Sequence, residues 1–124
     1  MPRFKQNGNV TGPELLEEHV RRFNAAVRSG DFGPMLELFA DDAVLEFRGV
    51  PVGPFHGREV IADAYAAQPP DDQIDVLEIE ENDAEIRARY AWLRDEGRAA
   101  GDMFLTRDGD RITKLVVTFD SPPS

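Results

Sequence analysis

The sequence predicts an α+β fold, with helices packed on one face of a curved, mainly antiparallel sheet. Two observations predict it. Before Pro70, apolar side chains recur mostly at helical spacing, whereas after it they mostly alternate along the chain. Helices followed by strands that short turns connect are typical of α+β domains. With 124 residues, the chain has the size of a single domain.

The first helix is expected to begin after Thr11 and to end at Gly30. Thr11 and Glu14 form a capping box, in which hydroxyl and carboxylate bind the first free amides of the helix. Residues 1–10 are polar, and we expect a flexible N-terminal arm there. An apolar stripe then follows at helical spacing: Leu16, Val20, Phe23 and Val27.

A second helix is predicted over about residues 32–40, and a first strand over about 43–47. The loop 48–55 contains two glycines and two prolines. Gly57 then opens a third helix, which Pro69 ends.

The rest of the chain is predicted to form a meander of strands joined by short turns. In the first of these strands two apolar sets compete, and a β-bulge would reconcile them. The domain is expected to span residues 11–120, with a tail at 121–124. The predicted strands are 73–80, 84–93, 98–107 and 111–120.

Composition excludes several classes of function. The formal net charge of −10 repels nucleic-acid phosphates and anionic lipid surfaces, so we expect neither partner. With no cysteine, disulfides, thiolate catalysis and cysteine-bound metals are excluded. No apolar run is long enough for a membrane span or a signal peptide, which predicts a cytoplasmic protein.

Metal and cofactor sites find no support in the sequence. His19 and His56 have no companions at ligand spacing, so we predict no metal. Gly49, Gly53 and Gly57 match no nucleotide-binding motif, and we expect no cofactor.

Apolar side chains on the faces that converge between helices and sheet form a candidate ligand site. They either fill a packed core or line a cavity for a small apolar molecule. The candidate ligand-binding residues are Phe23, Phe39, Phe47, Tyr90, Trp92, Phe104, Leu115, Val117 and Phe119.

The stretches 39–47 and 55–65 resemble the nuclear-transport-factor-2-like (NTF2-like) superfamily, especially its SnoaL-like and ketosteroid-isomerase-like members. In the first stretch a helix breaks at paired aspartates into a strand, and in the second a loop opens a helix. The resemblance extends over about residues 15–120. It implies a cone-shaped barrel, with three N-terminal helices on a strongly curved sheet around an apolar pocket.

The resemblance also implies roles for single positions. The proton-transferring carboxylate of ketosteroid isomerases corresponds to Phe47, and an oxyanion-binding tyrosine corresponds to Phe23. A supporting tyrosine of the second helix corresponds to Phe39, whereas that of the third helix is kept as Tyr65. The protonated aspartate of the oxyanion hole matches Asp102. The usual steroid isomerisation is therefore not expected.

Asp102 is the candidate acid or base. Its apolar neighbours predict a raised pKa if the carboxyl faces the cavity, as the resemblance implies. The alternative is a solvated aspartate paired with Arg98 or Arg89. Tyr65 and His56 complete the predicted catalytic set as hydrogen-bond donors.

Alternatives apply to Tyr65 and His56 as well. Tyr65 could be a core tyrosine whose hydroxyl reaches the surface. His56 could be an exposed loop histidine or a helix cap. His19 lies at the edge of the apolar stripe and is expected to be solvated.

Three functions compete on this basis. The first is a cofactor-free proton-transfer enzyme, isomerase-, cyclase- or lyase-like, that acts on an apolar substrate. The second is a non-catalytic module that binds an apolar ligand or a protein. Epoxide hydrolysis ranks last, because it needs an arginine between carboxylates inside the cavity, and Arg87 and Arg89 have outward parity.

A homodimer through the outer face of the sheet is also expected. Relatives often pair in this way, and an apolar strip of Met103, Leu105 and Val116 would lie on that face.

Overall fold

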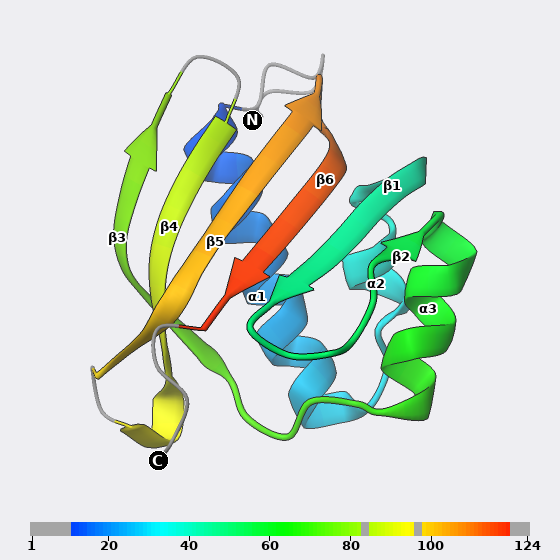
Figure 1. The fold of residues 1–124 in the computed structure, drawn as a ribbon, viewed down its shortest axis with the longest axis horizontal. Coiled ribbons are helices and arrows are strands. Elements are labelled where there is room, and N and C mark those ends of the chain that lie inside the picture. Colours follow the sequence, from blue (N-terminus) through cyan, green and yellow to red (C-terminus); the bar gives the residue numbers. More distant parts are fainter. Residues whose placement is uncertain (1–10, 83–84, 96–97, 120–124) are drawn as a thin grey trace, which may run out of the picture.

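The structure is a computed structural model, in which residues 11–82, 85–95 and 98–119 are described (Figure 1). The predicted N-terminal arm 1–10 and tail 121–124 lie outside these residues. Three helices pack on one face of a curved, six-stranded sheet with the strand order β2-β1-β6-β5-β4-β3. The α+β class is therefore confirmed, and the sheet stays open between β2 and β3 rather than closing into a barrel.

The elements follow the predicted order closely. The helices are α1 (Gly12–Ser29), α2 (Gly33–Leu36) and α3 (Arg58–Ala67), with a 3₁₀ turn at Leu93–Asp95. The strands are β1 (Phe39–Arg48), β2 (Phe55–His56), β3 (Ile74–Glu81), β4 (Glu85–Trp92), β5 (Ala99–Asp108) and β6 (Arg111–Thr118).

Helix α1 begins and ends as its sequence predicts. The Thr11 hydroxyl accepts a hydrogen bond from the Glu14 amide, and the Glu14 carboxylate accepts one from the Thr11 amide. Gly30 closes the helix with a left-handed backbone at φ 85°. In Figure 1, α1 runs behind the sheet, so its apolar stripe faces the core.

The second helix is shorter than predicted. It ends at Leu36, and Phe39 and Ala40 belong to β1 instead. Phe39 pairs with Ile112 of β6 in parallel register and is fully buried, so sheet pairing overrides the local helical pattern. The register then shifts between Phe39 and Val44, at the paired aspartates. Only the β1–β6 pair is parallel among the strands described.

The predicted bulge in β3 is confirmed. Val76 pairs with Tyr90 and Glu78 pairs with Arg89, so Leu77 is the extra residue. Leu77 is accordingly exposed at 41%.

Strand β5 has an inner face toward the helices and an outer face toward solvent. Met103 and Leu105 are buried on the inner face. The prediction that they form an apolar strip on the outer face is therefore wrong, because alternate residues of a strand point to opposite faces. The homodimer itself stays a prediction.

Gly101 holds the end of β5 against the end of β6. A Cβ atom at this position would lie 1.9 Å from the backbone oxygen of Thr118. That oxygen also accepts a hydrogen bond of 3.0 Å from the Tyr90 hydroxyl. The close approach of β5 and β6 thus requires glycine at position 101.

Among residues 11–82, 85–95 and 98–119, no helix has both the length and the apolar character that a membrane crossing requires.

Candidate ligand-binding site

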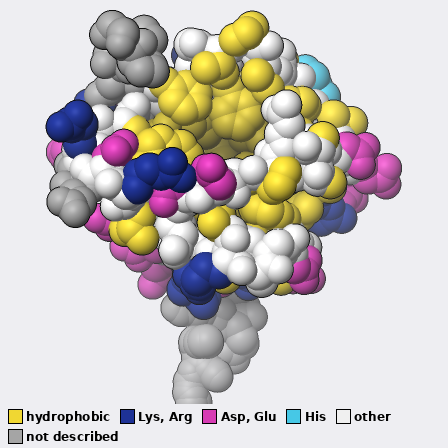
Figure 2. Space-filling view, turned by 90° about the horizontal axis from the view of Figure 1, so that it is seen from below, with side chains coloured by type: hydrophobic (Ala, Val, Ile, Leu, Met, Phe, Trp, Pro, Cys, Tyr) yellow, Lys and Arg dark blue, Asp and Glu magenta, His cyan; other side chains and the backbone are white. Residues whose placement is uncertain are grey.

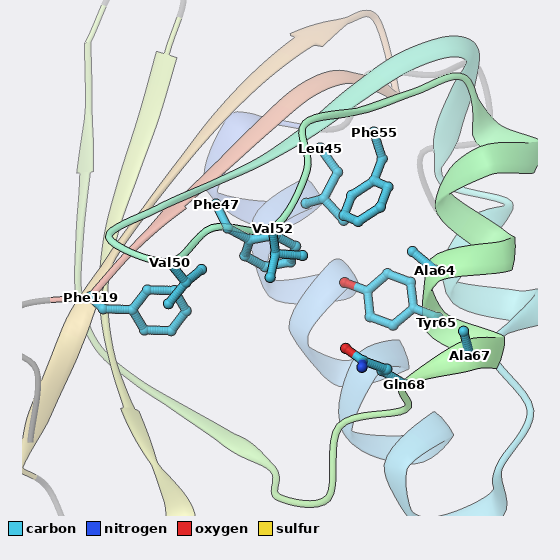
Figure 3. A pocket seen from close by; sticks show the side chains of 10 residues that line it. All are labelled: Leu45, Phe47, Val50, Val52, Phe55, Ala64, Tyr65, Ala67, Gln68 and Phe119. Atoms are coloured by element: carbon cyan, nitrogen blue, oxygen red, sulfur yellow. The ribbon is translucent and has the colours of Figure 1, made fainter.

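A cavity opens between α3, β1 and the loop that joins β1 to β2. Its outer chamber has a volume of about 400 Å³ (Figure 3). Figure 2, seen from below Figure 1, shows an apolar hollow on this side of the molecule. The outer chamber is lined by Leu45, Phe47, Val50, Val52, Phe55, Ala64, Tyr65, Ala67, Gln68 and Phe119.

An inner chamber of about 140 Å³ lies deeper, between α1 and the sheet. The two chambers share Phe47, Tyr65, Gln68 and Phe119, so they adjoin each other at these four residues. No Asp, Glu, Lys or Arg is among the described residues that line either chamber. The further residues of the inner chamber are His19, Phe23, Pro70, Ile74, Tyr90, Trp92, Met103, Leu115 and Val117.

Tyr65 places a neutral phenol where the chambers meet. It lies on the inward side of α3, and its ring stacks on Phe32 with a centroid distance of 5.0 Å. The hydroxyl points into the cavity, as the stick view shows (Figure 3). Burial raises the pKa of Tyr65 above its ordinary value of 10.0, so the hydroxyl stays protonated and can donate a hydrogen bond.

His19 lines the inner chamber, and the prediction that it is solvated is wrong. It is only 2% exposed and lies against the rings of Phe23 and Phe39, at centroid distances of 6.5 and 5.6 Å. Burial lowers the pKa of His19 to about 4, so the imidazole is neutral at pH 7. Its Nδ1 is buried and has no hydrogen-bond partner among the described residues.

The sequence contained a signal for this position. His19 follows Leu16 by three residues and precedes Phe23 by four, which places all three on one helical face. A polar side chain on that stripe is therefore buried with its apolar neighbours.

Asp102 lies on the other side of the sheet, and the prediction that it faces the cavity is wrong. It shares the outer face with Arg87 and Arg89, because Met103 takes the inner face of β5. Its Oδ1 lies 3.2 Å from Arg87 Nη1, and its Oδ2 lies 3.0 Å from Arg89 Nη1. The alternative of an arginine-paired surface aspartate describes this residue.

His56 does not reach the cavity either. It is exposed, pairs with Val44 in the short β1–β2 ladder and lines neither chamber. The three predicted catalytic residues are thus not brought together, and Tyr65 alone of them lines the cavity.

Most of the predicted ligand-binding residues do line the chambers, with two exceptions. Phe39 is fully buried in the core beneath His19. Phe104 lies on the outer face, where it pairs with Arg87 and Val116 in the ladder. The residues that line a chamber are Phe23, Phe47, Tyr90, Trp92, Leu115, Val117 and Phe119.

Several lining residues were missed from the sequence. Val50 and Val52 belong to the loop after β1, and their exposure of 39% and 40% places them at the mouth of the cavity. Gln68 follows α3 and directs its amide into the cavity (Figure 3). Valines between glycines and prolines of a loop are a weak signal, because nothing local shows which way such a loop folds.

A family model described as the SnoaL-like domain matches residues 20–115. The chain belongs to the SnoaL-like domain family. A comparison with curated protein sequences gives no match.

Solved structures with the same fold match most of this SnoaL-like chain. An NTF2-like protein from Cytophaga hutchinsonii is 17% identical, with a TM-score of 0.69, and the match covers 90% of this chain and 92% of that one. A SnoaL-like protein from Burkholderia thailandensis is 16% identical, with a TM-score of 0.67 and coverage of 90% and 98%. A "putative polyketide cyclase" from Sinorhizobium meliloti is 22% identical, with a TM-score of 0.59 and coverage of 83% and 97%. At these identities the likeness shows the fold alone.

Proposed function

We propose that this SnoaL-like protein binds a small, uncharged, mainly apolar molecule in its two-chambered cavity. The observation that carries the proposal is the lining, in which the described side chains are apolar apart from a few neutral polar groups. Cavities of this volume with few polar groups are typical of small-molecule sites.

The energetics of transfer favour a neutral ligand. Moving a charge from water into such a lining is costly, because the described lining offers no opposite charge. Burial of apolar surface contributes about 25 cal/mol for each Å² removed from water. A charged substrate is therefore disfavoured, and a ring or short hydrocarbon skeleton is favoured.

The polar groups give the ligand an orientation. Tyr65 and Gln68 both direct polar atoms into the cavity where the chambers meet (Figure 3). A ligand with one oxygen atom near this junction would pair with the Tyr65 hydroxyl or the Gln68 amide. We expect such a ligand to bind more tightly than an isomer whose oxygen atom lies away from this junction.

A second candidate function is proton transfer on the bound molecule, of the isomerase or cyclase kind and without a cofactor. It is supported by the neutral hydrogen-bond donors Tyr65 and His19, which line the cavity and can stabilise negative charge that develops on a ligand oxygen as a proton moves. The polyketide cyclase name of the Sinorhizobium meliloti structure is compatible with it. Asp102 takes no part in this proposal, since it lies on the outer face.

Two matched valines test the binding site. Val52 lines the outer chamber and is 40% exposed, whereas Val60 is 45% exposed on α3 and lines neither chamber. The probe is the neutral dye N-phenyl-1-naphthylamine, whose fluorescence rises in apolar surroundings. Val52→Asp is expected to weaken dye binding at least about tenfold, because it places a carboxylate at the mouth of the cavity.

Val60→Asp is the control and is expected to bind the dye as the wild type does. Equal affinities of both variants and the wild type would show that the dye does not enter the cavity. Failure of the wild type to bind would count against the proposal as a whole.

A further inference from the structure

We infer that His19 is the polar anchor of the inner chamber and donates a hydrogen bond to a carbonyl oxygen of the ligand. The inference rests on the proposed function, and it names a position and a ligand class that the proposed function leaves open. It starts from a buried imidazole for which the described residues provide no partner at Nδ1.

An unpaired polar atom in a protein interior is costly and uncommon. Buried side-chain nitrogen and oxygen atoms nearly always have a hydrogen-bond partner. Among the described residues, His19 Nδ1 is the only such atom without one. A structural role does not account for it, because phenylalanine or leucine would fill the same place between Phe23 and Phe39 without that cost.

The two nitrogens of the ring have different surroundings. Nδ1 is buried, whereas the ring as a whole lines the inner chamber. The ring therefore meets the chamber through its other edge, where Nε2 is the nitrogen available to a ligand.

The tautomer of His19 follows from which of its two ring nitrogens can remain without a hydrogen-bond partner. A neutral imidazole has one N–H donor and one bare nitrogen that accepts. In the protein backbone, unpaired buried N–H groups are rarer than incompletely paired carbonyl oxygens, and we apply the same order to the two ring nitrogens. The proton is therefore assigned to Nε2, which makes His19 a hydrogen-bond donor toward the chamber.

The matching ligand group is an uncharged acceptor. A carboxylate or phosphate would accept the bond, but the described lining has no cation that would offset its burial. A ketone oxygen accepts without a charge. A volume of about 140 Å³ is also close to the cavity of about 150 Å³ that holds one benzene molecule in an engineered protein. The inferred ligand class is thus a neutral ketone with about one six-membered ring in the inner chamber.

Two probes of the same shape test the inference. Acetophenone has a carbonyl oxygen where α-methylstyrene has a methylene group, and both displace N-phenyl-1-naphthylamine if they enter the cavity. The ratio of the acetophenone affinity to the α-methylstyrene affinity is expected to be about fivefold to tenfold higher in the wild type than in His19→Leu, because this comparison cancels the different hydration of the two probes. Infrared spectroscopy should show the carbonyl stretch of bound acetophenone at a lower wavenumber than in hydrocarbon solvent.

Three variants of His19 distinguish a hydrogen bond from Nε2 from one from Nδ1. His19→Gln places an amide N–H near the position of Nε2, whereas His19→Asn places one near Nδ1. The higher affinity ratio and the infrared shift should persist in His19→Gln. Both should be lost in His19→Asn and His19→Leu.

The possible results distinguish a failure of the His19 inference from a failure of the cavity proposal. An affinity ratio that is unchanged in His19→Leu and His19→Asn, or a wild type without the infrared shift, would overturn the role of His19 and leave the cavity proposal intact. If the wild type binds the dye but neither probe displaces it, the inferred ketone ligand is overturned, whereas the cavity proposal is decided by dye binding and its loss in Val52→Asp. The infrared shift in the wild type needs no variant, so the inference stays testable if a substitution prevents folding.

Discussion

The two faces of strands β4 and β5 differ in the ionisable groups that they carry: paired charges on the outer face and neutral groups on the inner face. On the outer face, Arg87 and Arg89 are paired with Asp102 within 3.2 Å, and all three have contact with solvent. On the inner side, the ionisable side chains among the described cavity residues are His19, Tyr65 and Tyr90, and burial shifts the pKa values of His19 and Tyr65 in the directions that keep both neutral. Charges thus lie where water and opposite charges stabilise them, and neutral donors lie where a ligand can meet them.

This difference has a lesson for function. A carboxylate in a strand is a candidate catalytic residue only if its side chain lies on the face of the sheet that lines the cavity. One residue along β5 separates the outer Asp102 from the inner Met103. A shift of one position in a strand therefore decides whether a side chain can contact a ligand in the cavity.

The largest effect is expected from Gly101→Ala, which disturbs the contact between the start of β5 and the end of β6. The added Cβ would lie 1.9 Å from the Thr118 backbone oxygen, so β5 and β6 must separate there. We expect a loss of about 3 kcal/mol or more in the free energy of unfolding, measured with urea.

Gly109→Ala is the control, since it meets no atom within 4 Å and changes only a turn with φ +64°. It should cost about 1 kcal/mol. A smaller loss for Gly101→Ala than for Gly109→Ala would contradict the close approach of the two strands.

An intermediate effect is expected from pH, through His19 on the inner side. The pKa of His19 is lowered from 6.5 to about 4 in the folded protein, so between these values the unfolded chain binds more protons. Stability therefore falls as pH decreases through this window. Between pH 7 and 4.5 the loss from this group is about 2–3 kcal/mol.

The comparison with His19→Gln isolates this contribution, because glutamine does not titrate and the carboxylates are common to both proteins. Urea unfolding at pH 7 and pH 4.5 should show a smaller loss in the variant. The same loss in both proteins would mean that His19 is not buried as a neutral ring.

The smallest effect is expected from Asp102→Asn on the outer face. The substitution removes the carboxylate charge that pairs with Arg87 and Arg89 but leaves the cavity lining unchanged. The free energy of unfolding should change by less than about 1 kcal/mol, as for partly exposed ion pairs. Binding of N-phenyl-1-naphthylamine should match the wild type, and a tenfold weaker affinity would place Asp102 in the site after all.

Much of the fold could be predicted because local patterns and tertiary packing agree. The capping box of Thr11 and Glu14, the end of α1 at Gly30 and the bulge at Leu77 all depend on neighbouring residues. The second helix was overestimated because Phe39 pairs with Ile112, a residue far along the chain. Local periodicity contains no information on such a pairing.

The site could be predicted only in part. Aromatic residues in clearly alternating strands, such as Tyr90 and Trp92, do line the inner chamber. Asp102 could not be placed, because strand β5 has apolar residues on both sides and its alternation leaves the facing open. The loop residues Val50 and Val52 belong to the lining only because the loop folds back over the mouth.

By itself, the sequence determined the order of helices and strands, the acidic surface and the supply of aromatic side chains, since these follow from composition and short-range pattern. Only the tertiary structure decided which side of β5 faces the helices and which polar groups are enclosed. The physical reason is that facing and burial are set by contacts between distant segments. His19 is neutral and enclosed because α1 packs against the sheet, and Asp102 is charged and outside because Met103 takes the inner position.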